Sequence, residues 1–577
     1  MRRIVRRPAI ELPAEVSNRL PGVLQRVYAR REIRSARELE LGLAHLLPPG
    51  DLAGIDPATR LLAEALRRQH RICVVGDFDA DGATSCALAL RGLRAMGARR
   101  IGYLVPNRFE YGYGLSPELV DLAVREQDPD LIITVDNGIS SLEGVAAARA
   151  RGIGVLVTDH HLPGDALPAA DAIVNPNLPG QAFGSRALAG VGVMFYVLAA
   201  LRSHLRREDW FADEHLPEPR LDRLLDLVAL GTVADVVPLD HNNRILVAQG
   251  LGRIRTGQGC PGIRALLEVA GRDPDRLVAS DLGFAAGPRL NAAGRLTDMA
   301  LGVECLLTDD PRRARSLAAR LDGLNRERRE IEARMTDEAL ALLDHLGDPV
   351  SGGQRPLGLC LMDGAWHQGV IGILASRLKE RYQCPVVAFA PTGEGMLKGS
   401  GRSVPGLHLR DLLEAISRRH PGLVGKFGGH AMAAGLNLRA ADFPRFREAF
   451  EAALAEALRD GLPDAEVASD GELTGAELNL DAARQLREAG PWGQGFPEPV
   501  FDGCFQVTGS RIVGERHVRF NLAHPDGGGP LEAIAFNGVA QGWEALDGAT
   551  PRLAYRLDVN HWRGRERAQL VVEHVEP

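Results

Sequence analysis

Short apolar runs alternate with segments of helical periodicity over the first third of the chain. The predicted strands are residues 72–76, 101–105, 131–135 and 154–157. The predicted helices are residues 83–96, 117–126 and 142–151. This alternation predicts a parallel sheet with helices on both faces. Ligands of such sheets bind beyond the carboxyl ends of the strands, so we expect the chemistry of the protein there.

The hydrophobic pattern changes twice farther along the chain. A charged helical segment with an apolar stripe covers residues 309–346 and predicts a long helix that bridges two domains. Strand and helix patterns restart at Leu357, and short apolar strands replace helices after about residue 500. The fold class is therefore α/β, with a second, smaller α/β domain and a C-terminal β-barrel of the OB type. The predicted bounds are 1–50 for an N-terminal arm, 51–250 for the parallel-sheet domain, 251–350 for a connector, 351–462 for the smaller α/β domain and 463–577 for the barrel.

Three aspartates follow the first predicted strand at intervals of two residues: Asp77, Asp79 and Asp81. Carboxylates this close repel one another and raise each other's pKa, which favours a bound cation. The alternative is an acidic Asp-Gly turn that merely closes the strand.

Other candidate ligands follow other predicted elements. Asp136 ends the third strand, Asp159, His160 and His161 end the fourth, and Asp235 follows an apolar helix. Together with the first cluster they supply carboxylate oxygens and imidazole nitrogen. Two divalent ions are expected, with Mn²⁺ preferred and Mg²⁺ as a weaker occupant.

Composition narrows the protein class. The chain has 577 residues, 25% of them charged, and a net charge of −7, which argues against a globally basic coat for nucleic acid. Residues 1–37 nevertheless carry ten Arg against three Glu. This basic arm is either a solvated, partly disordered tail or a contact for the phosphate backbone. Apolar runs long enough for a membrane span and a secretory signal are both lacking, which predicts a cytoplasmic protein without membrane partners.

Eight motifs in order resemble those of the DHH phosphoesterase family, and within it those of the bacterial exonucleases specific for single-stranded DNA. The motifs are VGDFDADG from Val75, TVDNGIS from Thr134, VTDHH from Val157, GTVAD from Gly231, GPRLNAAGR from Gly287, WHQGVIG from Trp366, GSGRS from Gly399 and FGGH from Phe427. The resemblance extends from about Arg60 to the end of the chain. It implies a DHH domain joined by the long helix to a DHH-associated domain, followed by an OB-like barrel.

The resemblance also implies roles for the acidic residues. Asp79 and Asp136 would hold the first ion, with Asp77 as an additional or supporting group. Asp81, Asp136, His160 and Asp235 would hold the second, so that Asp136 bridges the two ions. His161 is the expected general acid or phosphate donor, and Asp159 is expected to orient an imidazole ring.

Substrate contacts are expected from both domains. Arg108, Ser400 and Arg402 resemble a pocket for a 5′-terminal phosphate, which would impose 5′-to-3′ direction. His430 is a further donor in the DHH-associated domain. Arg289, Asn291 and His367 are expected along the path of the strand, although capping and structural hydrogen bonds are an equal alternative for them.

The implied activity is hydrolysis of single-stranded DNA to 5′-mononucleotides by a two-metal mechanism, in DNA recombination and repair. Single-strand-binding protein and a helicase are implied partners. Two alternatives remain: a DHH phosphodiesterase for cyclic dinucleotides or short oligonucleotides, and a catalytically inactive DNA-binding scaffold. Chain length argues against the first and the intact ligand set against the second.

Overall fold

The computed structural model describes residues 2–107, 110–111, 113–345, 356–459, 461, 465–527, 529–562 and 564–576. The chain forms two compact units. The first unit holds Ile4–Asp322 and Glu466–Pro577, and the second unit holds Met1–Arg3 and Gly323–Ala465. The five domain bounds predicted above stay predictions.

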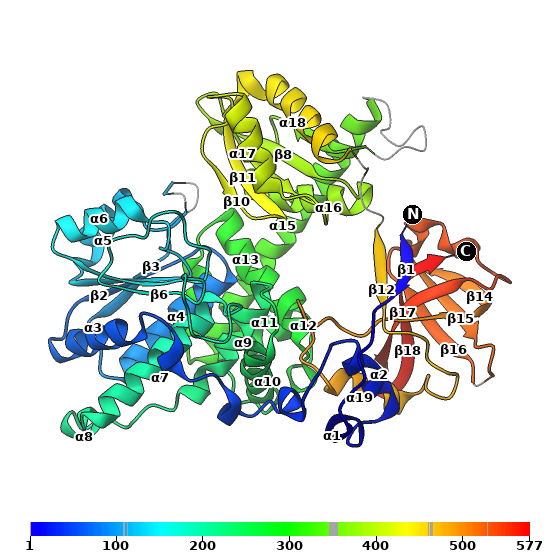
Figure 1. Ribbon diagram of the computed structural model, residues 1–577, viewed down its shortest axis with the longest axis horizontal. Coiled ribbons are helices and arrows are strands. Elements are labelled where there is room, and N and C mark those ends of the chain that lie inside the picture. The colour runs from blue at the N-terminus through cyan, green and yellow to red at the C-terminus, as the bar shows by residue number, and fades with distance from the viewer. Residues whose placement is uncertain are drawn as a thin grey trace. The chain divides into compact units, whose positions relative to one another are not determined.

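A five-stranded parallel sheet lies in the N-terminal part of the first unit, at the left in Figure 1. Its strands are β2 (Ile72–Gly76), β3 (Ile101–Leu104), β4 (Leu131–Val135), β5 (Gly154–Thr158) and β6 (Ala172–Val174). The spatial order is β3-β2-β4-β5-β6, with every pair parallel. Four of these strands are the predicted ones. The sequence analysis missed β6, whose three residues are too short for a clear pattern.

Helices cover both faces of this sheet. On one face, α5 (Pro117–Gln127) and α6 (Leu142–Ala150) pack through Leu119, Val145 and other apolar side chains against the strands. On the other face lie α4 (Ala80–Ala95) and α7 (Gly190–Arg207). The helix α4 begins three residues earlier than predicted, because Asp79 caps it and Asp81 falls in its first turn.

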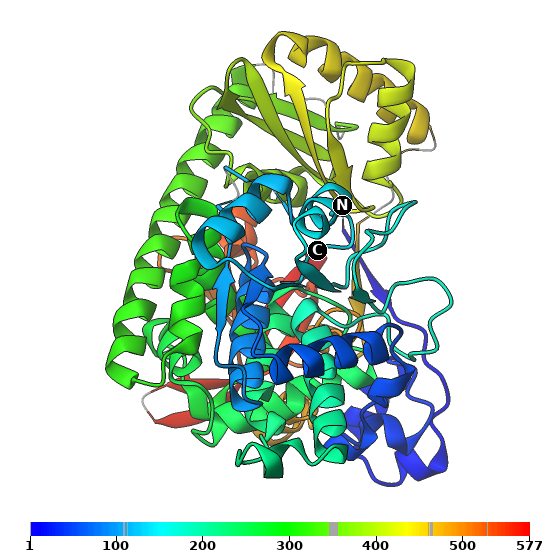
Figure 2. The same cartoon turned by 90° about the vertical axis from the view of Figure 1, so that its left-hand side faces the viewer.

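The remaining helices of the first unit complete the domain around the sheet. They are α3 (Ile55–Arg67), α8 (Trp210–Asp213), α9 (Leu225–Ala234), α10 (His241–Arg255), α11 (Pro261–Val269), α12 (Ala279–Asp281), α13 (Gly287–Leu296) and α14 (Ala300–Leu307). The long helix α15 (Pro311–His345) runs from the first unit into the second, and it is the long green helix in Figure 2. At about 1.5 Å per residue it extends over about 50 Å, as the charge and apolar stripe predicted.

The second unit is an α/β domain with a mixed sheet of five strands in the order β10-β11-β9-β8-β7. The strands are β7 (Leu359–Met362), β8 (Val386–Gly393), β9 (Met396–Arg402), β10 (Phe427–Gly429) and β11 (Ala433–Arg439). The helices are α16 (Ile371–Tyr382), α17 (Leu409–Arg419) and α18 (Phe443–Ala457). Phe389, Phe446 and Phe450 are fully buried in its core.

The C-terminal part of the first unit is a six-stranded sheet in the order β13-β17-β18-β16-β15-β14. Its strands are β13 (Phe501–Cys504), β14 (Gln506–Val513), β15 (His517–Ala523), β16 (Leu531–Ala535), β17 (Arg552–Trp562) and β18 (Arg565–Glu576), and α19 (Leu480–Glu488) precedes them. Strand pairing and buried apolar side chains agree with an OB-like domain. Closure of the sheet into a barrel stays a prediction.

The N-terminal segment packs on this C-terminal domain, so the expectation of a solvated, disordered tail is wrong. Strand β1 (Arg3–Arg6) pairs with β12 (Glu466–Ser469), and the short helices α1 (Ala14–Ser17) and α2 (Gly22–Ala29) follow. Arg31 binds Asp470 at 2.6 Å, and Arg6 binds Asp502 at 2.9 Å. Several arginines of this arm are therefore neutralised by carboxylates of the C-terminal domain, and a contact of the arm with the phosphate backbone stays a prediction.

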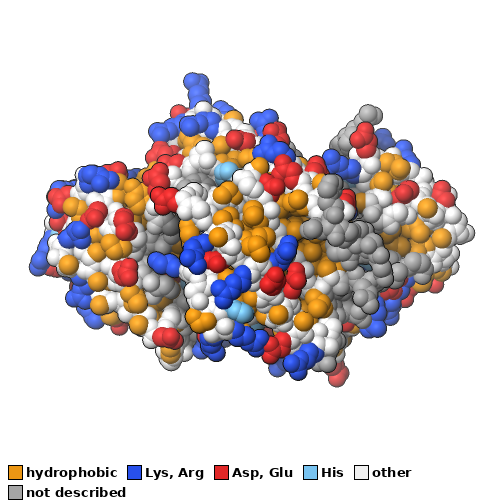
Figure 3. Space-filling model, turned by 90° about the horizontal axis from the view of Figure 1, so that it is seen from above, with side chains coloured by type: hydrophobic (Ala, Val, Ile, Leu, Met, Phe, Trp, Pro, Cys, Tyr) orange, Lys and Arg blue, Asp and Glu red, His pale blue; other side chains and the backbone are white. Residues whose placement is uncertain are grey.

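Charges are mixed over the surface. On the face drawn in Figure 3, basic and acidic side chains are interspersed with apolar ones, in line with the net charge of −7. Among the described residues, no helix is both long and apolar enough to cross a membrane.

Candidate metal centre

The turn between β2 and α4 brings three aspartates to the carboxyl end of the sheet. Asp77 directly follows the strand, and Asp79 Oδ1 caps α4 by accepting a hydrogen bond from Gly82 N at 3.0 Å. A Cβ at Gly82 would lie 2.3 Å from the carbonyl oxygen of Asp77. The close approach of helix to strand end therefore requires glycine here. Asp81 lies in the first turn of α4, fully buried.

Asp136 follows β4 in a left-handed backbone conformation, with φ of 62°. For a residue other than glycine this conformation costs on the order of 1 kcal/mol. Asn137 holds the turn, because its Nδ2 donates to the carbonyl oxygens of Val75 at 3.1 Å and Val135 at 2.9 Å. A Cβ at Gly190 would lie 2.6 Å from the Cβ of Asp136, so α7 begins directly against this aspartate. Backbone strain that the surrounding structure stabilises, as at Asp136, is typical of a functional position.

The two histidines after β5 have different partners. His160 Nε2 lies 3.1 Å from Asp136 Oδ1 and 3.4 Å from Asp235 Oδ2. His161 Nδ1 lies 2.8 Å from Asp159 Oδ1, and the hydroxyl of Tyr113 lies 3.2 Å from the same nitrogen. The first imidazole thus joins the carboxylate cluster, and the second belongs to a separate Asp-His-Tyr arrangement.

Asp159 is buried and hydrogen-bonded to the loop around His161, and its expected role in orienting the imidazole ring stays a prediction. Its Oδ2 accepts a hydrogen bond from Ile139 N at 2.9 Å, and its Oδ1 accepts one from His161 N at 3.1 Å. Burial lowers the pKa of His161, but the hydrogen bond and charge of Asp159 outweigh it and raise that pKa to about 9. The pair therefore favours a charged imidazole next to the carboxylate cluster.

All six predicted metal ligands fall into groups whose ligand atoms lie within 4.8 Å of one another. The groups are Asp77 with Asp79 and Asp136, Asp81 with His160 and Asp235, and Asp136 with His160 and His161. Asp136 occurs in two groups, which agrees with a bridging position. The structure thus brings together side chains from the ends of β2, β4, β5 and α9.

Electrostatics in this cluster favour a cation. Burial, together with the charges of Asp81 and Asp79, raises the pKa of Asp136 well above its usual value. Burial and the charge of Asp79 raise the pKa of Asp81 to about 7, and burial and Asp81 raise that of Asp235. Among the described residues, no arginine or lysine forms an ion pair with these three aspartates. A divalent cation would supply the missing positive charge.

The donor set fits Mn²⁺ or Mg²⁺. Asp136 Oδ1 is buried and accepts no hydrogen bond from any residue that the structure describes. Carboxylate oxygens with one imidazole, as in the group of Asp81, His160 and Asp235, suit Mn²⁺, and the all-oxygen group of Asp77, Asp79 and Asp136 also suits Mg²⁺. The buried acceptor and the ligand types therefore both agree with a two-ion centre.

Two of the predicted substrate contacts have structural partners in the first unit. Asn291 Oδ1 accepts a hydrogen bond from Ala80 N at 2.8 Å, which supports the start of α4 beside the cluster. Arg289 is buried, and its Nε donates to Asp322 Oδ1 at 2.9 Å. Their roles in substrate binding stay predictions, and these contacts agree with the structural alternative.

The second unit holds four further predicted contacts. Arg402 Nη1 donates to Ser400 Oγ at 3.2 Å and to the carbonyl oxygen of Gly401 at 2.8 Å. His367 Nδ1 accepts from Gly369 N at 3.1 Å, and His430 N donates to the carbonyl oxygen of Ala433. Arg108 lies outside the described residues.

Sequence reasoning missed several residues that shape the site. Tyr113 is one of them, because its hydroxyl lies 3.2 Å from His161 Nδ1. Asn175 and Asn177 were not singled out, although their Nδ2 atoms donate to the carbonyl oxygens of His161 and His160. The pattern Asn-Pro-Asn directly after a short strand was the available signal, because such residues make side-chain hydrogen bonds to nearby backbone.

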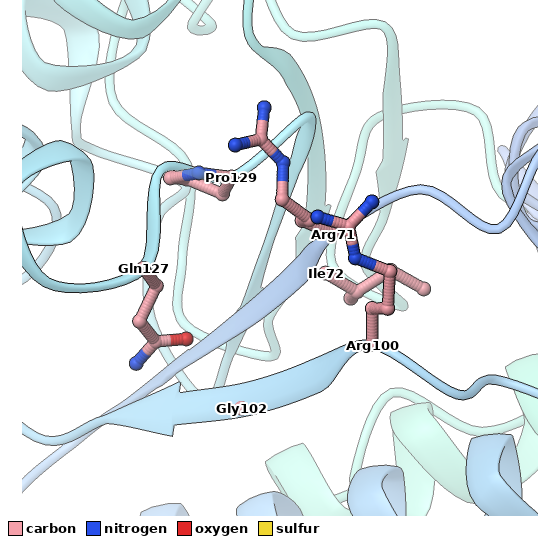
Figure 4. Close-up of a pocket in the computed structure, with 6 residues that line it drawn as sticks. All are labelled: Arg71, Ile72, Arg100, Gly102, Gln127 and Pro129. Atoms are coloured by element: carbon pink, nitrogen blue, oxygen red, sulfur yellow. The ribbon is translucent and has the colours of Figure 1, made fainter.

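A pocket at the opposite edge of the sheet is remote from this chemistry. It lies at the amino ends of β2 and β3, and Figure 4 shows its lining residues Arg71, Ile72, Arg100, Gly102, Gln127 and Pro129. Arg71 is neutralised by Asp128 and Asp130. In open parallel sheets the amino edge is rarely the ligand edge, so this pocket is not the active-site candidate.

Three family descriptions match this chain in the order of its domains. The DHH family N-terminal domain matches residues 71–232, the DHHA1 domain residues 357–456 and the RecJ OB domain residues 469–574. The single-stranded-DNA-specific exonuclease RecJ of Dickeya dadantii is 58% identical over 99% of this chain and 98% of its own length. The chain belongs to the RecJ family.

Further RecJ proteins are similar to this chain in sequence or in solved structure. RecJ of Escherichia coli is 54% identical over 99% of both chains. RecJ of Thermus thermophilus in complex with Mn²⁺ has a TM-score of 0.82 at 32% identity and covers 100% of this chain and 80% of its own. Its complex with Mg²⁺ has a TM-score of 0.76. The RecJ family thus matches in sequence, domain order and fold.

Proposed function

We propose that this chain is an exonuclease that hydrolyses single-stranded DNA from the 5′ end to 5′-mononucleotides, in DNA recombination and repair. The Asp136-centred cluster carries the proposal, because it joins three groups of potential metal ligands at the carboxyl end of a parallel sheet. Membership of the RecJ family supports the same activity, since the similar curated proteins are named for it.

Two divalent ions would be held by these residues, with Mn²⁺ preferred and Mg²⁺ as an alternative. Asp77, Asp79 and Asp136 would hold one, and Asp81, Asp136, His160 and Asp235 the other. When bound, such a pair lowers the pKa of water and neutralises charge on the reacting phosphate. Both solved Thermus thermophilus structures support the choice of ions, since one contains Mn²⁺ and the other Mg²⁺.

His161 is proposed to donate a proton to the leaving 3′-oxygen or a hydrogen bond to the phosphate. Asp159 binds the ring through Nδ1 at 2.8 Å, and the hydroxyl of Tyr113 lies 3.4 Å from Nε2, so Nε2 is the nitrogen proposed to donate to the reacting group. A His161→Ala variant should therefore lose turnover while it retains Mn²⁺ affinity. Full turnover in this variant would contradict the assignment.

The 5′-to-3′ direction of hydrolysis is proposed to come from a pocket in the second unit that binds the 5′-terminal phosphate. Arg402 is half-buried, desolvation lowers its pKa, and among the described residues no carboxylate pairs with it. A Cβ at Gly372, in the first turn of α16, would lie 2.9 Å from Ser400 Oγ and 3.0 Å from Arg402 Nη2. A half-buried guanidinium without a carboxylate partner, beside a hydroxyl and a helix start, suits an anion. Arg108 is proposed as a third donor.

An Arg402→Ala variant tests this pocket. It should lose the preference for 5′-phosphorylated over 5′-hydroxyl oligonucleotides, whereas Arg419→Ala should keep it. Arg419 is a suitable control, because it lies on the surface of the same unit and pairs with Glu456. An unchanged preference in Arg402→Ala would rule out the pocket.

One assay tests the activity as a whole. A 5′-labelled single strand, the matching duplex and a cyclic dinucleotide are each incubated with the full chain and Mn²⁺. Release of mononucleotides from the single strand alone is the expected result. Cleavage of the cyclic dinucleotide alone would favour the phosphodiesterase alternative, and binding without cleavage the scaffold.

Single-strand-binding protein and a helicase are proposed as partners, and the cytoplasm as the compartment, because the substrate would be bacterial DNA. Degradation of a single strand coated with single-strand-binding protein should then be at least as fast as that of the naked strand. Inhibition by the coat would contradict this partner.

A further inference from the structure

The segment from the end of β6 into the first turn of α7, residues 175–191 and called the loop below, contacts the metal centre at both of its ends. At the first end, Asn177 Nδ2 donates to the carbonyl oxygen of His160 at 2.6 Å. Asn175 Nδ2 donates to the carbonyl oxygen of His161 at 2.9 Å. Two side-chain amides thus hold the backbone of both adjacent histidines.

At its other end, the same loop holds Asp81. The backbone N–H groups of Gly190 and Val191 donate to the two carboxylate oxygens of Asp81 at 2.6 Å and 3.0 Å. These groups are the free donors at the start of α7, where a carboxylate is favoured. One continuous segment therefore orients ligands that come from two different strand ends.

The first end of the loop is itself rigid. Asn177 N donates to Asn175 Oδ1 at 2.7 Å, which forms an Asx turn around Pro176. Gln181 Nε2 donates to the carbonyl oxygen of Asn175 at 2.6 Å, and Gln181 Oε1 accepts from Ala53 N at 3.0 Å. Asn175 is fully buried. The side-chain amides of Asn175 and Asn177 are therefore themselves part of a hydrogen-bonded turn.

The position of the two imidazoles shows why the backbone needs such support. Successive side chains of an extended chain point to opposite sides. The ring centroids of His160 and His161 are nevertheless only 4.5 Å apart. The backbone must bend sharply after β5 to place both rings together. The hydrogen bonds from Asn175 and Asn177 stabilise this bend.

We propose that Asn177 is a positioning residue that sets the His160 imidazole for one of the two metal ions. The inference rests on the metal centre proposed above. His160 belongs to the group with Asp81 and Asp235 and to the group with Asp136 and His161, whereas the group of Asp77, Asp79 and Asp136 does not contain it. Loss of the Asn177 donor should therefore weaken one ion site and spare the other.

Calorimetric titration of Mn²⁺ into the metal-free full chain tests the proposal. Wild type should bind two ions. Asn177→Ala should bind one of them about 10-fold to 100-fold more weakly, which is the usual effect of removing a support of a metal ligand. The affinity of the other ion should stay within about twofold of wild type.

The matched control is Asn479→Ala. Asn479 caps α19 in the C-terminal domain, where its Oδ1 accepts from Ala482 N at 2.9 Å. This variant should lose stability through the lost cap while both Mn²⁺ affinities stay unchanged. If Asn177→Ala does not fold, Asn177→Leu is used, because its side chain has a similar size and contains no hydrogen-bond donor.

The titrations of wild type and of the two variants separate the role of Asn177 from the existence of the metal centre. Equal weakening of both ions in the Asn177 variant, or no weakening, would overturn the positioning role. Wild type that bound no Mn²⁺ would overturn the metal centre itself and the positioning role with it. Selective weakening in Asn177→Ala but not in Asn479→Ala would establish the role of this loop.

Discussion

Two sets of buried aspartates in the first unit have opposite electrostatic surroundings. Asp81 and Asp136 at the carboxyl end of the parallel sheet have no arginine or lysine partner among the described residues, and burial raises their pKa values. Asp470 and Asp502 in the C-terminal domain are as deeply buried, but each pairs with two arginines.

The difference shows that burial alone does not tell a structural carboxylate from a functional one. A buried charge is costly unless it is paired. The C-terminal set is neutralised by the protein itself and therefore serves folding. The carboxylates at the end of the sheet are left for a cation from solution. One of them, Asp136, also has a strained backbone conformation.

Removing a carboxylate that is paired with arginines, Asp470 or Asp502, should have the largest effect on stability. Asp470→Ala leaves Arg31, whose side chain is 2% exposed, as a buried charge without its partner. We expect a loss of about 3–5 kcal/mol in the free energy of unfolding. Denaturant unfolding measures it, with the exposed pair of Arg34 and Glu32 as control. Arg34→Ala should cost less than about 1 kcal/mol.

Removing a carboxylate from the unpaired set should act on catalysis instead. Asp136→Asn should lower mononucleotide release on the order of 10²-fold to 10³-fold. The same change removes repulsion between buried carboxylates, so the metal-free variant should unfold at a temperature no lower than wild type. Asp165→Asn, at an exposed position, should change neither property. A marked loss of metal-free stability in Asp136→Asn would break the comparison.

Metal should stabilise only the unpaired set. An ion present at about 100 times its Kd adds about 2.7 kcal/mol to the free energy of unfolding. Thermal melting with Mn²⁺ and with a chelator should therefore differ for wild type and agree for Asp136→Asn. An equal shift in both proteins would place the bound ion elsewhere.

Acid should weaken the paired set at low pH. Burial raises the pKa of Asp502, but hydrogen bonds from Arg6, Ser469 and Arg552 outweigh it and hold the pKa at about 2. This value lies below the unfolded value of about 3.9. The stabilisation is therefore complete above about pH 4 and is lost as the pH falls through about 2. It amounts to about 2 kcal/mol.

Comparison of wild type with Asp502→Asn checks this effect. The stability of wild type should fall more steeply between about pH 4 and pH 2 than that of the variant. Parallel curves would show that the pKa of Asp502 is not depressed in the folded protein.

Local patterns predicted much of the fold and the metal centre. The strands that precede Asp77, Asp136 and Asp159 are continuous apolar runs, and parallel pairing brings their carboxyl ends to one edge. The long helix α15 was also predicted to within two residues at its start. These features depend on short segments whose hydrophobic period is visible in the sequence.

Hydrogen bonds and ion pairs between segments far apart in the sequence were not predicted. Arg31 and Asp470 are separated by 439 positions, and Gly190 and Asp81 by 109. No period or motif in either partner indicates such a pair. Asn177 lies closer in sequence to His160, whose carbonyl oxygen it binds, and its Asn-Pro-Asn pattern was the one available signal.

The sequence by itself determined which side chains carry the chemistry, because the aspartates and histidines stand at strand ends in a recognisable order. Only the tertiary structure decided which of the buried carboxylates are neutralised and which await a cation. The physical reason is that the energy of a charge depends on its burial and on the distance to its neighbours in space. Separation along the chain does not enter that energy.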